Sequence, residues 1–81
     1  MTKKEVHDYT KMLVQEFGVS ISEIARMASV ERTNLSKWLN HYETTNMRPE
    51  RLQRLQATVL AIAYGANQMS EMHSQLTNIV L

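Results

Sequence analysis

Two short apolar series at helical spacing follow one another between residues 20 and 40, with one break between them. The apolar positions are Ile21, Ile24, Ala25 and Ala28 in the first series, and Leu35, Trp38 and Leu39 in the second. Ser29 and Val30 interrupt the pattern, so both helices must be short. Ala25 is small, and apolar residues follow it 5, 10 and 13 positions later, which suits two helices that cross near a right angle. The segment therefore predicts two short helices that share one core across a tight turn.

The start of the first of these helices carries a strong local signal. Ser20 and Glu23 form a capping box, in which a hydroxyl and a carboxylate satisfy free backbone N–H groups at a helix N-terminus. Val19 and Ile24 stand at the two positions of a hydrophobic staple. We therefore expect a helix to begin at Ser20.

The residues before this segment predict one further helix. Thr2 and Glu5 make another capping box. Apolar residues then recur along one helical face at Val6, Tyr9, Leu13 and Phe17. Gly18 follows, and glycine commonly ends a helix because it adopts the left-handed backbone conformation without steric cost. The pattern predicts a helix over about 3–17 and a turn at Gly18.

The chain after the central segment predicts a loop and two more helices. Residues 40–47 are polar and rich in turn-forming types, and Pro49 suits the first turn of a helix. The apolar stripe of that helix is Leu52, Leu55, Val59 and Ile62. Gly65 can close it, and a last stripe over 67–80 consists of Met69, Met72, Leu76 and Val80. The pattern as a whole predicts an all-α fold with five helices.

The length and composition restrict the class of protein. A chain of 81 residues holds one domain, which we place at 1–81 with its core at about 3–65. There is no cysteine, which excludes disulfides and thiolate metal sites. No stretch approaches the roughly 18 consecutive apolar residues of a membrane span, and the N-terminus lacks a signal-like apolar run. We expect a cytoplasmic protein.

The charge is small in total but uneven along the chain. The formal net charge is +1. The middle of the chain has a surplus, in which the basic residues Arg26, Arg32, Lys37, Arg48, Arg51 and Arg54 face the acidic residues Glu23, Glu31, Glu43 and Glu50. Arginine side chains there can reach phosphates, so the distribution permits a nucleic-acid partner.

The segment 21–40, ISEIARMASVERTNLSKWLN, resembles the helix-turn-helix of the Cro/CI (lambda-repressor-like) family. Ala25 matches the small residue where the helices cross, Val30 matches the plug of the turn, and Leu35 and Trp38 match the anchors of the second helix. The resemblance implies a lambda-repressor-like domain, with a helix-turn-helix at about 20–40, that binds double-stranded DNA. Its recognition helix would start near Glu31, run to about Asn40 and enter the major groove.

The resemblance also implies which side chains meet DNA. Those expected at base edges are Arg32, Thr33, Asn34, Ser36 and Lys37. Those expected at the DNA backbone are Ser20, Ser22, Asn40, His41 and Tyr42. Arg48 joins them as a backbone contact, although Arg48, Arg51 and Arg54 could equally form a solvated face. Two positions depart from the family pattern: Ser29 replaces the usual glycine of the turn, and Ile21 replaces a glutamine that often anchors a phosphate.

Other kinds of site find little support. His7, His41 and His73 are scattered without metal-ligand spacing, so we expect no metal and no cofactor. No nucleophile and base stand at a catalytic spacing, so we expect no enzyme. Trp38 falls at an apolar position and is expected in the core.

These observations predict a sequence-specific regulator of transcription, most simply a repressor that occludes a promoter of a phage or another mobile element. Binding as a homodimer would let two recognition helices span two half-sites. The residues expected at the dimer interface are Met69, Met72, Leu76 and Val80, which could instead complete the monomer core. An alternative is a protein-interaction module on the same fold, such as an antirepressor or an antitoxin, and a regulatory protein partner is compatible with either.

Overall fold

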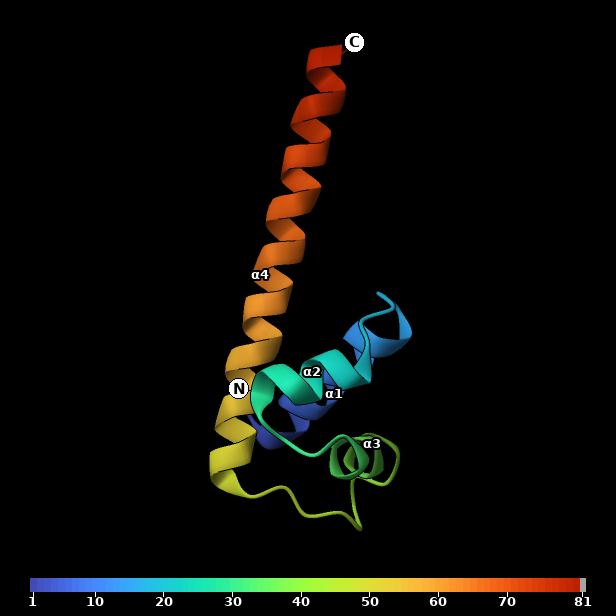
Figure 1. Ribbon diagram of the computed structural model, residues 1–81, viewed down its shortest axis with the longest axis vertical. Helices are drawn as coiled ribbons and strands as arrows, with labels where there is room; N and C mark the ends of the chain where they lie inside the picture. Colours follow the sequence, from blue (N-terminus) through green and yellow to red (C-terminus); the bar gives the residue numbers. More distant parts are fainter. Residues whose placement is uncertain (81) are drawn as a thin grey trace.

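Helices supply the regular structure of residues 1–80 in the computed structural model (Figure 1). The structure describes the backbone of residues 1–80 and the side chains of residues 1–65. The four helices are α1 (Lys3–Gln15), α2 (Ile21–Ala28), α3 (Arg32–Asn40) and α4 (Pro49–Val80). α1 and α2 pack against α4, and α3 packs against α1 and α2. The all-α class predicted from the sequence is confirmed, with four helices where five were expected.

α1 begins as predicted and ends earlier. The Thr2 hydroxyl accepts from the Glu5 N–H at 3.1 Å, and the Glu5 carboxylate accepts from the Thr2 N–H at 3.0 Å, which completes the capping box. Gly18 takes the left-handed conformation (φ +68°), and the Val19 N–H donates to the Leu13 carbonyl at 3.0 Å. This reversal takes Phe17 off the helix. Its ring is 64% exposed, so its predicted place on the buried face is wrong.

α2 begins at Ile21, one residue after the predicted start, with Ser20 as its N-cap, and its capping box forms differently. The Ser20 hydroxyl accepts from the Glu23 N–H at 3.3 Å, which satisfies one free backbone donor. The Glu23 carboxylate turns to Arg26, three residues later on the exposed face, and Arg26 Nε donates to Glu23 Oε2 at 3.3 Å. A charge-assisted bond of this kind competes well with a neutral backbone donor.

The turn between α2 and α3 holds a strained residue and an arginine cap. Ser29 adopts the left-handed conformation (φ 55°, ψ 44°), where glycine is usually favoured because it has no Cβ. Arg54 of α4 donates from Nε to the Ala28 carbonyl at 3.0 Å and from Nη2 to the Ser29 carbonyl at 3.3 Å. These bonds satisfy carbonyls at the C-terminus of α2 that the helix itself leaves free.

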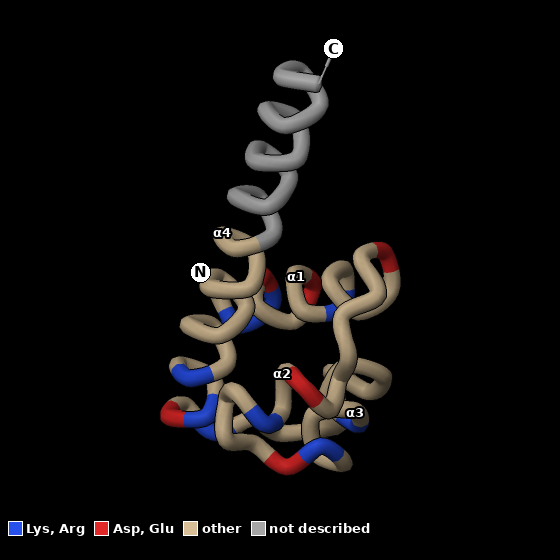
Figure 2. The backbone as a smooth tube through the Cα atoms, turned by 45° about the horizontal axis from the view of Figure 1, so that its top comes forward, with Lys and Arg blue, Asp and Glu red and all other residues tan. Residues whose placement is uncertain are grey.

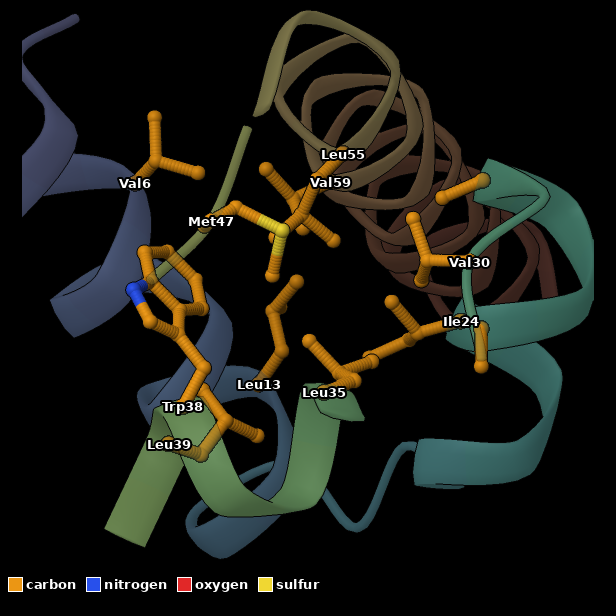
Figure 3. Packing of buried hydrophobic residues seen from close by; sticks show 12 residues of the cluster. Val6, Leu13, Ile24, Val30, Leu35, Trp38, Leu39, Met47, Leu55 and Val59 are labelled. Carbon is orange, nitrogen blue, oxygen red and sulfur yellow. The ribbon is translucent and has the colours of Figure 1, made fainter. Parts of the chain in front are cut away.

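The core contains side chains from every helix (Figure 3). Its largest fully buried members are Trp38, Ile24, Leu35, Leu55, Val6 and Val59. Trp38 is thus a core residue, as predicted, and its Nε1 has no hydrogen-bond partner among the described residues. Met47 is also buried, although it ends the predicted polar loop. The sequence pattern missed Met47 because a single apolar residue in a loop has no periodicity.

The predicted break at Gly65 is wrong, because α4 is continuous from Pro49 to Val80. Gly65 does not have a positive φ, and apart from its chain neighbours and the backbone of its own helix, no atom lies within 4 Å of where its Cβ would be. A glycine within a helix costs about 1 kcal/mol relative to alanine, which neighbouring alanines and the absence of a following proline can offset. The predicted dimer residues Met69, Met72, Leu76 and Val80 lie outside the residues whose side chains the structure describes.

Candidate nucleic-acid interface

α3 presents a polar face opposite its buried face. The helix spans Arg32–Asn40, with Glu31 at its N-cap, as predicted. Its core-facing residues are Leu35, Trp38 and Leu39. Successive residues of an α-helix are rotated by about 100°, so the side directly opposite these three carries Thr33, Lys37 and Asn40. All three residues of that outward row are exposed.

The remaining predicted base-contacting residues flank this outward row. Arg32 and Ser36 lie on one side of the row, where Arg32 is exposed and Ser36 is half-buried. Asn34 lies on the other side and is half-buried. The five predicted side chains therefore lie outside the core-facing row of α3, over an arc of about 200°. The structure adds Asn40, which was predicted at the DNA backbone, to the middle of the same arc.

The predicted DNA-backbone residues occupy three separate places. Ser20 and Ser22 are exposed at the start of α2. His41 is the exposed C-cap of α3, and Arg48 is exposed immediately before α4. Tyr42 is half-buried and is largely used in packing. The other five predicted DNA-backbone residues are all exposed, unlike Tyr42.

The packing of Tyr42 involves an aromatic cluster beside α1. Its ring centroid lies 4.6 Å from that of His7 and 5.9 Å from that of Trp38. The ammonium of Lys4 lies 4.5 Å from the centroid of the Tyr42 ring, and that of Lys3 lies 5.9 Å from it. These contacts tie the loop after α3 to the first turns of α1.

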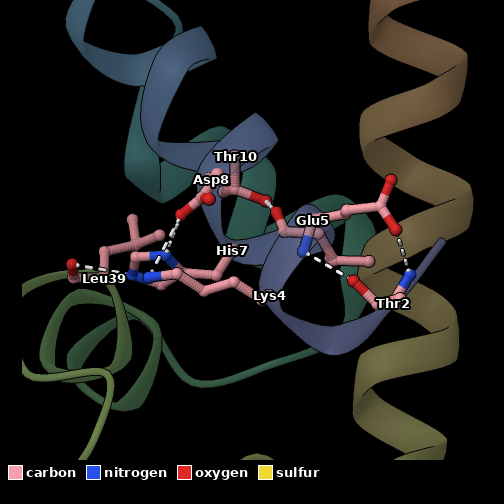
Figure 4. Close-up of polar contacts among 8 residues, drawn as sticks. Thr2, Lys4, Glu5, His7, Asp8, Thr10 and Leu39 are labelled. Atoms are coloured by element: carbon pink, nitrogen blue, oxygen red, sulfur yellow. Dashed lines mark hydrogen bonds and ion pairs between the residues drawn. The ribbon is translucent and has the colours of Figure 1, made fainter.

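His7 holds the C-terminal end of α3 in place (Figure 4). The side chain is 4% exposed, and Nε2 donates to the Leu39 carbonyl oxygen at 3.0 Å. Nδ1 hydrogen-bonds Asp8 Oδ1 at 2.9 Å, and the ring lies edge-on to Trp38 at 5.2 Å. His7 is therefore a positioning residue for α3. The sequence offered no signal for it, because its partner Leu39 is 32 residues away.

The same contact perturbs the titration of Asp8. The hydrogen bond from His7 lowers the pKa of the Asp8 carboxyl below its usual value, and Lys4, whose Nζ lies 3.4 Å from Oδ1, lowers it further. This carboxylate is exposed, so solvent weakens both interactions. The carboxylate of Asp8 is thus engaged by His7 and Lys4.

The cations of the α3 face are free of ion pairs. Within residues 1–65 the ion pairs are Lys4 with Asp8, His7 with Asp8, and Arg26 with Glu23. None of them involves Arg32 or Lys37. Figure 2 shows Lys and Arg positions on α3 and on the first turns of α4, at the same end of the molecule. Arg32 and Lys37 are therefore not engaged in ion pairs within the protein and can interact with a partner.

Among the described residues, no group of three or more His, Asp or Glu is placed to hold a metal ion. No helix in the described part is both long and apolar enough to span a bilayer. Comparison with protein-family models, with curated proteins and with solved structures finds no match to this chain.

Proposed function

We propose that this protein binds double-stranded DNA in a sequence-specific manner, with α3 in the major groove, and regulates transcription. The observation that carries the proposal is the outward face of α3, which is polar, exposed and free of ion pairs while the opposite face is locked into the core. An α-helix with its side chains is about 10–12 Å across, which matches the roughly 12 Å width of the major groove.

The side chains on this face suit base edges. Arg32 can donate to guanine O6 and N7, Asn34 can pair with adenine, and the Thr33 methyl can contact a thymine methyl. Ser36 can donate to or accept from a base. Lys37 has the reach of a base contact and of a phosphate contact.

The start of α2 supplies a phosphate contact in the same proposal. Ser20 and Ser22 are exposed there, and the free N–H groups of a helix N-terminus favour an anion. Backbone contacts of this kind hold the protein in register without reading the sequence. They allow a chain of net charge +1 to bind DNA, because the positive groups are local.

We infer that the regulatory role is that of a dimeric repressor. It would cover a promoter of a phage or another mobile element, with Met69, Met72, Leu76 and Val80 joining two copies. Two copies present two recognition helices to half-sites about one helical turn, roughly 34 Å, apart.

A protein-binding role is the second candidate, and one feature favours it. A cavity of about 210 Å³ lies between the end of α1 and α4, and the residues around it are Tyr9, Met12, Leu13, Phe17, Val19, Ile62 and Ala63. This apolar cavity is separate from the polar face of α3. An antirepressor or toxin that docked there would leave the DNA-binding face of α3 open.

Selection from a random-sequence duplex pool tests the DNA-binding proposal. We expect enrichment of a two-fold symmetric site. The affinity for that site should fall as the salt concentration rises: for each phosphate neutralised, log K should decrease by about 0.9 per log unit of salt. Arg32→Ala should cost about 1–3 kcal/mol and relax the preference at one base position. Arg26→Ala is the matched control, because Glu23 already pairs with Arg26. If no sequence is enriched and binding is weak at physiological salt, the proposal is wrong and protein partners should be sought.

A further inference from the structure

A groove runs along one side of α3, between that helix and the start of α4. It has a volume of about 430 Å³, and its lining residues are Glu31, Thr33, Asn34, Lys37, Asn46, Arg48 and Arg51. α3 contributes Thr33, Asn34 and Lys37 to one wall, while the opposite wall comes from the loop before α4 and from its first turn. Side chains that are distant in sequence thus line one groove beside α3.

The groove is positively charged. Lys37, Arg48 and Arg51 face a single carboxylate, that of Glu31. None of these three cations takes part in the ion pairs found within residues 1–65. Arg48 immediately precedes α4 and Arg51 lies in its first turn, and both line this groove.

The three arginines at the start of α4 do not share one role. Arg54 is directed at the end of α2, where it donates to the Ala28 and Ser29 carbonyls. Arg48 and Arg51 line the groove instead. A uniformly solvated arginine face, which the spacing alone permits, would not divide in this way.

We infer that this groove binds the phosphodiester backbone of the DNA strand that runs alongside α3, with Arg48 and Arg51 on one wall and Lys37 on the other. The inference rests on the proposed DNA-binding function. When α3 fills the major groove, the walls beside the helix face the phosphates at the rim of that groove. Lys37 is thereby assigned to the backbone in place of a base edge, and Arg51 is added to the contacts predicted from sequence.

The fit of the site to a phosphate is chemical as well as geometric. Arginine presents a planar fork of donors that pairs with two phosphate oxygens, and lysine acts as a compact point charge. Arg51 is half-buried, so the protein already restricts part of its side chain. Donors spread over two walls suit an extended strand better than a single small anion.

Salt titration of binding separates these contacts from base readout. The variants are Arg48→Gln, Arg51→Gln, Lys37→Gln and the Arg48→Gln/Arg51→Gln double, each tested on the selected duplex and on an unrelated duplex. Each single variant should lower the salt slope by about 0.9 for each protomer bound and weaken binding about fivefold per protomer at 0.15 M salt, on both duplexes alike. The double variant should lower the slope by about 1.8 for each protomer bound. Arg26→Gln, which removes a cation already paired with Glu23, should leave the slope unchanged.

Two controls separate a lost phosphate contact from a loss of folding. Arg51→Lys retains the charge and should restore most of the slope. Thermal melting followed by circular dichroism checks that every variant folds. If the wild type binds the selected duplex and the variants keep its slope, the groove assignment is wrong while the proposed function stands. A change confined to the selected duplex would assign the side chain to a base and also overturn the inference. Absence of duplex binding by the wild type overturns both proposals.

Competition with inorganic phosphate distinguishes a groove that binds the phosphates of a DNA strand from one that binds a free phosphate ion. At constant ionic strength, phosphate should not saturate the groove or compete with the duplex beyond its effect as a salt. Saturable binding of phosphate at submillimolar concentration, lost in the Arg48→Gln/Arg51→Gln double variant, would show a site for a free anion and contradict the assignment to a DNA strand.

Discussion

Ser29 has an unfavourable backbone conformation that the fold requires. Its left-handed conformation (φ 55°) costs a residue with a Cβ about 1 kcal/mol or more, yet the turn between α2 and α3 requires it. The cost is tolerated because Val30, which follows it, is buried, and because Arg54 donates to the Ser29 carbonyl.

Ser29→Gly should therefore stabilise the domain. We expect the free energy of unfolding to rise by about 0.5–1 kcal/mol, since glycine removes the strain but loses more entropy on folding. The midpoint of thermal unfolding should rise by a few degrees. Ser29→Ala keeps the strain and is the control. A glycine variant no more stable than the alanine variant would contradict this account of the turn.

Asp8 should make stability depend on pH in the acid range. The His7 and Lys4 contacts lower its pKa in the folded state, so its contribution is fully present above the unfolded pKa of about 3.9. That contribution is lost as the pH falls through the lower folded value. Denaturant unfolding from about pH 6 to pH 2 should show the wild type and Asp8→Asn converging as the pH falls. If the difference in the free energy of unfolding between the wild type and Asp8→Asn stays constant over this pH range, the contacts of Asp8 with His7 and Lys4 are not its cause.

At the scale of the elements, the local signals predicted the starts of helices well. The capping residues Thr2 and Ser20 and the reversal at Gly18 act through neighbours only a few residues away, so the sequence contains all the information needed. Helical periodicity likewise identified the outward face of α3, because the buried anchors Leu35 and Trp38 determine which residues point away from the core.

The features that were missed depend on packing between distant segments. The burial of His7 and Met47 and the groove that joins Arg51 to α3 follow from how the helices pack, which no local pattern contains. Gly65 was misread for another reason: glycine near the end of an apolar stripe is compatible with a stop and with a continuous helix, and α4 is continuous.

Gly65→Ala distinguishes these two roles of glycine in α4. In a continuous helix where, chain neighbours and the helix backbone apart, no atom lies within 4 Å of the new Cβ, alanine should stabilise by about 0.5–1 kcal/mol. If residue 65 instead ended a helix in the left-handed conformation, the same change would destabilise the protein. Circular dichroism measures the helix content, and the midpoint of thermal unfolding shows whether the substitution raises or lowers stability. A loss of stability would contradict the continuity of α4.

At the scale of the whole molecule, the continuity of α4 bears on how two copies would read DNA. The same helix that packs Leu55 and Val59 into the core continues to Val80. A dimer joined through the far part of α4 would therefore hold each recognition helix at a set distance, without a hinge at Gly65. Half-sites about 34 Å apart require this kind of fixed spacing.

Leu76→Glu should abolish the proposed dimer. Beyond residue 65 the sequence carries the single charged residue Glu71, and the apolar residues Met69, Met72, Leu76 and Val80 recur at helical spacing. A carboxylate placed in that stripe would be costly to bury against a second copy. Sedimentation velocity should show a dimer for the wild type and a monomer for the variant. Leu60→Glu is the control, because Leu60 is exposed on α4 outside the predicted interface and its substitution should leave the dimer intact. A wild type that sediments as a monomer at every concentration, free and on DNA, would contradict the dimeric mode and leave a single recognition helix to bind one half-site.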